Sequence, residues 1–116
     1  MVDTNATKLT DAAFRIPFDP DVLFPEPMMF GGDIASEPTL KSDKSSKLVE
    51  GRPVFRVSGL MIMRNGRVFQ ASVSVFDNQV PAKGFVHFAG TCFITPYTTD
   101  NGRQAYSIVA ERLVEA

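Results

Sequence analysis

The chain has few of the residues that build metal sites, disulfides and nucleophilic active sites. Its 116 residues include one cysteine, one histidine and no tryptophan. Cys92 has no second cysteine to pair with, and Cys92 with His87 alone makes no zinc ligand set. The two lie five residues apart in one predicted strand, so at about 3.3 Å per residue they are about 16 Å apart and on opposite faces. We expect no metal and no cofactor, and we interpret Cys92 as a small buried hydrophobic residue.

Long apolar runs are also missing. No stretch of about 18 apolar residues is present to cross a bilayer. The opening residues MVDTNATKLTD lack the basic start and apolar stretch of a secretion signal. We therefore expect a soluble, cytoplasmic protein without a membrane partner.

Convergent catalytic groups are scarce as well. Acid–base chemistry needs carboxylates that meet, or a histidine with an orienting partner. The acids of the second half fall in predicted loops and strand ends, at Asp77, Asp100, Glu111 and Glu115. No phosphate-binding loop of the GxxxxGK type occurs. We do not expect an enzyme.

The charge is divided unevenly along the chain. Residues 1–46 have four lysines and arginines against eight aspartates and glutamates, a net −4, and residues 47–116 have eight against five, a net +3, which agrees with the total of −1. A basic region joined to an acidic one is compatible with contact to nucleic acid, although +3 is also ordinary for a solvated surface.

The composition also changes near residue 46. The segment RIPFDPDVLFPEPMMF, residues 15–30, has four prolines, each of which removes a backbone donor and biases its predecessor toward extended conformations. The following stretch GGDIASEPTLKSDKSSK has the polar, Gly- and Ser-containing composition of a flexible linker. We predict an acidic tail and linker over residues 1–46, largely irregular, and a folded domain over residues 47–116.

The second region is rich in β-branched and aromatic residues with closely spaced turn signals. Asn65-Gly66 supplies the positive φ angles of a type I′ hairpin turn, which predicts Arg64 opposite Arg67, Ile62 opposite Phe69 and Leu60 opposite Ala71. A second hairpin turns at Thr98–Arg103, with Asn101 and Gly102 as its left-handed residues. The four predicted strands are PVFRVSGLMIM, RVFQASVSVF, FVHFAGTCFIT and QAYSIVAERLV.

The strands are mixed in polarity on both faces, which favours a closed or partly closed small barrel over a flat sheet, because closure removes exposed edges. Along the third strand, Val86, Phe88, Cys92 and Ile94 form the predicted core face, whereas the face with Phe85, His87 and Phe93 should meet another layer, a partner or a ligand. Gly59 and Gly90, each within a strand, could mark the bends of a barrel. The fold class is therefore all-β: a small β-barrel of two main hairpins behind an extended or disordered acidic tail.

Residues 83–115 carry a more specific pattern: a lysine-glycine, an apolar strand with a central glycine, an aromatic residue, a polar glycine-containing turn and a tyrosine that opens the last strand. The pattern resembles the last two strands of the bacterial-type single-stranded-DNA-binding protein family, which has an oligonucleotide-binding (OB) fold. The family usually places a third strand and a helix between the hairpins, where this chain has only residues 77–82. We expect part of the tail to cover the barrel instead. The matching residues are Lys83-Gly84, Val86 to Gly90, Tyr97, Asp100-Asn101-Gly102-Arg103 and Tyr106.

The resemblance implies that Tyr97 stacks on a base, as the family's aromatic residue before the last turn does. The alternative is a tyrosine that caps the barrel end, and Tyr106 is interpreted as core. Base stacking tolerates any sequence, because every base has a π face. Phe69, Phe85 and Phe93 are further candidate stacking platforms, or core residues. Phosphate contacts are predicted for Arg56, Arg64, Arg67, Lys83 and Arg103.

The sequence therefore predicts a non-catalytic, largely sequence-independent binder of single-stranded DNA, RNA not excluded, that serves replication or transfer of a phage, plasmid or mobile element. The family implies a homo-oligomer. The alternative function is a structural or protein-interaction module. Residues 14–30 could dock on a protein partner as an extended acidic, apolar peptide, could cover the nucleic-acid site, or could be inert.

Overall fold

The computed structural model describes residues 15–116, which form an all-β fold with one short helix; the predictions for residues 1–14 lie outside this part of the chain. Among residues 15–116 no helix is long and apolar enough to cross a membrane. The elements, in chain order, are β1 (Ile16–Pro17), α2 (Pro20–Leu23), β2 (Met28–Ile34), β3 (Leu48–Val49), β4 (Arg52–Pro53), β5 (Phe55–Arg64), β6 (Arg67–Phe69), β7 (Ser72–Val75), β8 (Gly84–Thr98) and β9 (Gln104–Glu115).

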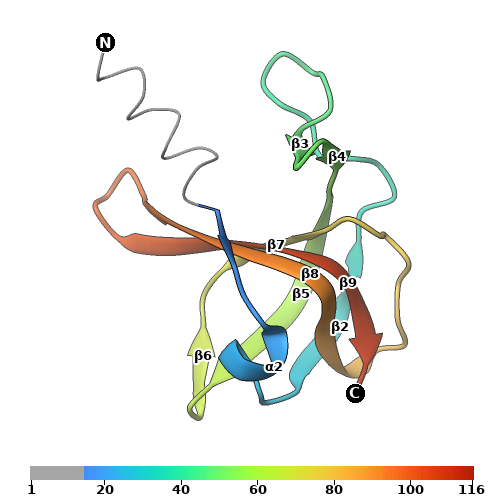
Figure 1. The fold of residues 1–116 in the computed structure, drawn as a ribbon, viewed down its shortest axis with the longest axis vertical. Helices are drawn as coiled ribbons and strands as arrows, with labels where there is room; N and C mark the ends of the chain where they lie inside the picture. Colours follow the sequence, from blue (N-terminus) through green and yellow to red (C-terminus); the bar gives the residue numbers. More distant parts are fainter. Residues whose placement is uncertain (1–14) are drawn as a thin grey trace.

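The main sheet closes on itself. Its strands follow the order β8-β2-β5-β7-β9, and β8 also pairs with β9, which completes a ring (Figure 1). The β7–β9 pair is parallel, and the other neighbours in the ring are antiparallel. Five strands in this Greek-key order form a barrel of the OB type. The prediction of a small, all-β, OB-like barrel is confirmed.

Strand β2 corrects the predicted boundary between tail and domain. Residues 1–46 were predicted to be irregular, yet β2 lies between β5 and β8 and pairs with both. The side chains of Met28, Phe30 and Ile34 are buried, so the segment fills the barrel. Pro27 is the last proline of the cluster, so residues 28–34 keep all their backbone donors and can pair on both sides. The barrel takes strands from both sides of residue 46.

The segment before β2 closes one end of the barrel. The ring of Phe24 is 2% exposed. It makes edge contacts with Phe18, Phe69 and Phe88, at centroid distances of 5.7, 5.3 and 5.9 Å. Residues 77–82, between the two hairpins, contain no helix or strand. The segment before β2 covers this barrel end with Phe24, as predicted. Phe24 is thus part of the chain's own core, with Phe18 and Leu23 packed against it, whereas Ile16 and Val22 of the same segment are exposed.

Two glycines bend the barrel strands, as predicted from their positions. Gly59 has φ +71° and Gly90 has φ +77°, and each adjoins a shift of register, in the β2–β5 and β8–β9 pairs. A Cβ atom on Gly90 would lie 2.4 Å from the Cβ of Glu111, and one on Gly59 would lie 2.4 Å from the Cα of Gly32. Side chains cannot enter at these corners, which is why the bulges use glycine.

The first hairpin turn is confirmed, and its extension is wrong. Asn65 and Gly66 have φ +54° and +74°, and Arg64 pairs with Arg67 and Ile62 with Phe69. Leu60 pairs with Phe30 of β2 and not with Ala71, because the chain leaves the strand at residues 70–71 before β7 begins.

The second hairpin differs in its turn. Gly102 has φ +80°, whereas Asn101 is not left-handed. The amide of Gly102 donates to the carbonyl of Thr99 at 2.9 Å, and the Thr99 hydroxyl accepts a hydrogen bond from the amide of Arg103 at 3.1 Å. Because Thr99 accepts both hydrogen bonds, the turn closes with Gly102 as its one left-handed residue.

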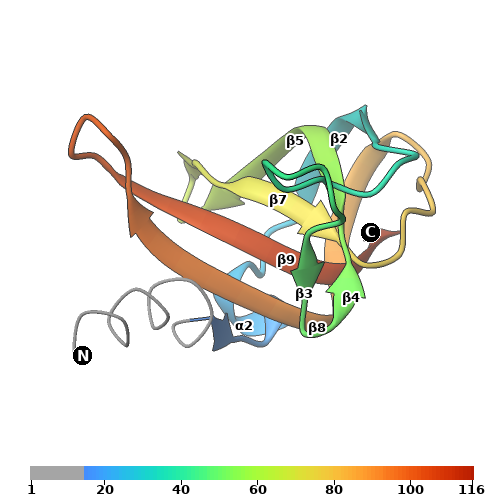
Figure 2. The same cartoon turned by 90° about the horizontal axis from the view of Figure 1, so that it is seen from above.

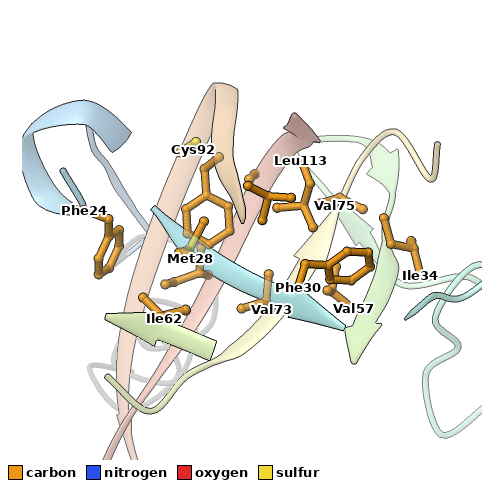
Figure 3. Packing of buried hydrophobic residues seen from close by; sticks show 14 residues of the cluster. Phe24, Met28, Phe30, Ile34, Val57, Ile62, Val73, Val75, Cys92 and Leu113 are labelled. Carbon is orange, nitrogen blue, oxygen red and sulfur yellow. The ribbon is translucent and has the colours of Figure 1, made fainter. Parts of the chain in front are cut away.

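The core fills the barrel interior, where side chains from β2, β5, β7, β8 and β9 converge (Figure 3). Val86, Phe88 and Cys92 of β8 are buried, as the predicted core face requires, and Ile94 packs against them partly buried. Burial raises the pKa of the Cys92 thiol to about 11. Because the thiolate is the nucleophile, such a group is unreactive at neutral pH.

The β3–β4 hairpin packs outside the barrel on a second cluster, formed by Val49, Val54, Phe76 and Val109 with Phe93 against it. Arg52 of β4 makes two hydrogen bonds to the carboxylate of Glu111, at 2.7 and 3.0 Å, and its guanidinium lies 4.2 Å from the centre of the Phe76 ring. The hydrogen bond from Arg52 lowers the pKa of Glu111 below 4.5. This pair fixes the hairpin to β9.

The Arg52–Glu111 pair predicts a pH dependence of stability. Since Glu111 has a lower pKa in the folded state, its contribution is complete above the ordinary glutamate pKa of 4.5 and is lost as the pH falls through the folded-state value. We expect Arg52→Met to raise the Glu111 pKa toward 4.5, measured by carbon NMR titration of its carboxyl group. The free energy of unfolding of Arg52→Met, measured in urea, should then fall less on acidification than that of the wild type. An unchanged Glu111 titration would contradict the assignment.

Candidate nucleic-acid interface

The β8–β9 hairpin extends beyond the barrel as an arm (Figure 2). The two strands pair as far as Thr98 and Gln104, whereas the parallel pairing of β7 with β9 begins only at Ser72 and Ser107. Toward its tip, β9 therefore has an edge that β7 does not cover. Residues 70–71, which interrupt the strand between β6 and β7, face this part of the arm across a hollow.

We call this hollow the arm cleft. It has a volume of about 450 Å³, within the range of small-ligand sites. It lies over β5 and β7, which are the second and third barrel strands in chain order. OB folds bind oligonucleotides on the face of these two strands. Its lining residues are Arg56, Val57, Gly59, Leu60, Gln70, Ala71, Ser72, Val73, Tyr97, Gln104, Ala105 and Tyr106.

Tyr97 stands on the arm with 44% of its surface exposed. Its backbone carbonyl accepts a hydrogen bond from the side-chain Nε2 of Gln104 at 3.2 Å, which ties the two strands together beside the ring. Tyr106 lies deeper and packs on Phe69, with centroids 5.0 Å apart and planes 32° from parallel. The cleft therefore combines an exposed aromatic ring, a partly buried aromatic pair and polar groups.

A second hollow lies next to the arm cleft, near the β3–β4 turn, and we call it the turn hollow. It has a volume of about 310 Å³ and shares Ser72 and Tyr97 with the arm cleft. Of residues 15–116, three cations and no aspartate or glutamate line the two hollows, although one of these cations, Arg15, is paired with Glu50. The residues of the turn hollow are Arg15, Lys47, Val49, Ser72, Thr95, Tyr97, Ser107 and Val109.

Of the predicted phosphate contacts, the structure brings Arg56 to the arm cleft beside Tyr97. Arg103 is exposed at the tip of the arm. Arg64 and Arg67 stand at the β5–β6 tip and line neither hollow. The Arg64 side chain donates a hydrogen bond to the carbonyl of Leu23 at 2.9 Å, so the N-terminal segment already holds it.

The remaining predicted residues lie elsewhere. Phe69 packs against the barrel core, and Phe93 packs under the β3–β4 hairpin. Lys83 and Phe85 lie at the start of β8, and the arm is built from its other end. Phe85 is 58% exposed, but neither residue lines the arm cleft or the turn hollow.

Several lining residues were missed by sequence reasoning, and Tyr106 was interpreted as core although it also borders the cleft. Local sequence carries no signal for the others, because they reach the arm only through long-range pairing. Residues 70–72 meet β9 because β7 pairs with it in parallel. Arg15 reaches the arm because β1 pairs with β8. The missed residues are Arg15, Lys47, Gln70, Ser72 and Gln104.

Comparisons with known proteins add no family to this geometry. The chain was compared with protein-family models, curated proteins and solved structures, and none matches. The barrel, the arm and the two hollows are therefore the features that indicate a function.

Proposed function

We propose that this chain binds single-stranded DNA without catalysis and largely without regard to sequence, with the strand passing over Tyr97 between the arm cleft and the turn hollow. The observation that carries the proposal is the position of Tyr97, an exposed ring that borders two adjoining hollows, to which Arg56 in one and Arg15 and Lys47 in the other bring positive charge. An unpaired base offers a face to such a ring, whereas a base within a duplex is already stacked on both sides.

The cations around Tyr97 support the same proposal. Arg56 lies in one hollow and Lys47 in the other, so phosphates on either side of a stacked base would each meet a positive charge. Contacts of this kind release counterions and weaken as salt rises. No group in the cleft is assigned to the 2′-hydroxyl, so RNA would share the chemistry. Binding of this type suits the protection of unpaired strands during replication or transfer of a phage, plasmid or mobile element.

An apolar strip favours self-association as well. Met29 pairs with Met61 on one side and with Phe85 on the other, and the three side chains are 43%, 49% and 58% exposed. They form an uncharged line across β8, β2 and β5. Two copies can bury the same strip against each other through a twofold axis, because an apolar strip is complementary to itself. We infer that a second copy of this chain covers the strip.

Tyr97→Ala tests the stacking. Loss of one base–aromatic stack costs about 1–3 kcal/mol, so we expect the dissociation constant for fluorescein-labelled oligo-dT to rise by about 5- to 150-fold. Tyr97→Phe keeps the ring and should bind within about twofold of the wild type. Fluorescence anisotropy measures all three proteins. Equal affinity of Tyr97→Ala and the wild type would contradict the proposal.

Arg56→Gln tests the phosphate contact. We expect weaker binding at low salt and a slope of log K against log salt that is shallower by about 0.7, the value for one phosphate on a single strand. The matched control is Arg112→Gln, since Arg112 is paired with Asp77 at 3.6 Å and lines neither hollow. An equal loss of affinity in both variants would mean that only the net charge of the protein matters, and not a contact made by Arg56. Binding without salt dependence, or no binding, would favour the protein-interaction module.

The self-association has a separate test. Met61→Lys places a charge at one end of the exposed strip without entering the core, and a second copy that covers the strip would have to bury this charge without a partner. We expect sedimentation velocity to show a larger species for the wild type and a monomer for Met61→Lys. Arg112→Gln serves again as the surface control and should sediment as the wild type does. A wild type that is monomeric at all concentrations would overturn the assignment.

A further inference from the structure

The β3–β4 turn has an unusual residue at its first position. Glu50 and Gly51 have φ +51° and +76° and are flanked by the pair Val49–Arg52, which makes a two-residue type I′ turn. The same chain builds its β5–β6 turn with almost the same angles from Asn65-Gly66. Asparagine tolerates the left-handed region, whereas a longer side chain such as glutamate rarely adopts it. The turn itself does not explain Glu50.

The contact made by Glu50 gives a reason for the residue. Its carboxylate Oε2 lies 2.8 Å from Nη1 of Arg15. The Arg15 side chain is only 15% exposed and lines the turn hollow, whereas the Glu50 side chain is 55% exposed. The arginine is therefore held at the wall of the hollow, and the carboxylate on it reaches into solvent.

The turn that carries Glu50 is fixed in place. Val49 is 2% exposed, and Arg52 anchors the next strand to Glu111 through two hydrogen bonds. The carboxylate thus meets Arg15 from a rigid base. Lys47, just before β3, lines the same hollow with Tyr97.

From these contacts we propose, on the basis of the proposed function, that the turn hollow is a second phosphate subsite and that Glu50 competes with phosphate for Arg15. Guanidinium binds carboxylate and phosphate through the same forked geometry. A phosphate beside Lys47 takes the place of the Glu50 carboxylate, which turns to solvent because it is already more than half exposed. Glu50 thereby lowers the affinity for a strand that reaches this hollow.

Ligands of different length can test the two hollows separately. Tyr97 borders both, so a thymidine dinucleotide can stack on it with its single phosphate near Arg56. A longer oligo-dT continues past Tyr97 into the turn hollow. Glu50 should therefore affect the longer ligand and leave the dinucleotide unchanged.

The test removes the carboxylate and keeps the turn. Glu50→Asn installs the residue that the chain uses in its other type I′ turn, and it should unfold at the same or a higher temperature than the wild type. Because the Glu50 carboxylate is 55% exposed and makes a single contact with Arg15, we expect about two- to fivefold tighter binding of long oligo-dT, measured by fluorescence anisotropy at low salt. The slope of log K against log salt should steepen by about 0.7, for one added phosphate contact.

A double-mutant cycle assigns the gain to Arg15. Arg15→Gln alone should change affinity little, because Glu50 already occupies the guanidinium, whereas Arg15→Gln combined with Glu50→Asn should lose the whole gain. The matched control is Asp77→Asn, which removes a carboxylate and releases Arg112, an arginine outside both hollows. Asp77→Asn should change the affinity for oligo-dT only by the general effect of one unit of net charge.

The outcomes separate this inference from the proposed function. If the wild type binds oligo-dT and Glu50→Asn binds no more tightly than Asp77→Asn, the second subsite is overturned and binding at Tyr97 stands. If the gain survives Arg15→Gln, the competition for Arg15 is wrong. If neither the wild type nor Glu50→Asn binds at any salt concentration, the proposed function itself fails.

Discussion

The pairing of β8 with β9 is the interaction on which both the barrel and the candidate site depend. The half of this ladder near the chain terminus closes the ring of strands, and the other half leaves the barrel as the arm. A bulge at Gly90, where a side chain would strike Glu111, bends the ladder within the barrel. A single hairpin thus joins the hydrophobic core to an exposed surface, and the position of Tyr97 is determined by the core packing of the same two strands.

The end of the barrel and its outer surface are covered by chain segments from before β5. Phe24 closes one end, and the β3–β4 hairpin covers a second apolar cluster on the outside. Where these two segments bury their apolar side chains, they also bring polar side chains close to the arm. Burial of aromatic and β-branched side chains supplies the stabilisation, and the same segments place the charged residues Arg15 and Lys47 in the hollow beside Tyr97.

Ion pairs around the arm divide into two kinds. Arg52 and Glu111 are bound by two hydrogen bonds under an aromatic contact, which suits a structural link. Arg15 and Glu50 share a single contact from a turn position that disfavours glutamate. The first pair holds the hairpin, whereas the second rests on one contact, from a carboxylate that is more than half exposed, and an anion can replace it. A phosphate-binding surface needs cations that are positioned but not permanently neutralised.

The sequence by itself determined the all-β class, the Asn65-Gly66 turn with the register of its first pairs, and the glycine bends. These features depend on φ preferences and alternation within a few residues, which can be read locally. Only the tertiary structure decided that β2 belongs to the barrel, that Phe69 packs against its core and Phe93 under the β3–β4 hairpin, and that Arg15, Lys47 and Arg56 line the hollows beside Tyr97. Those placements depend on which distant strands pair when the ring closes, and no local pattern specifies such pairing.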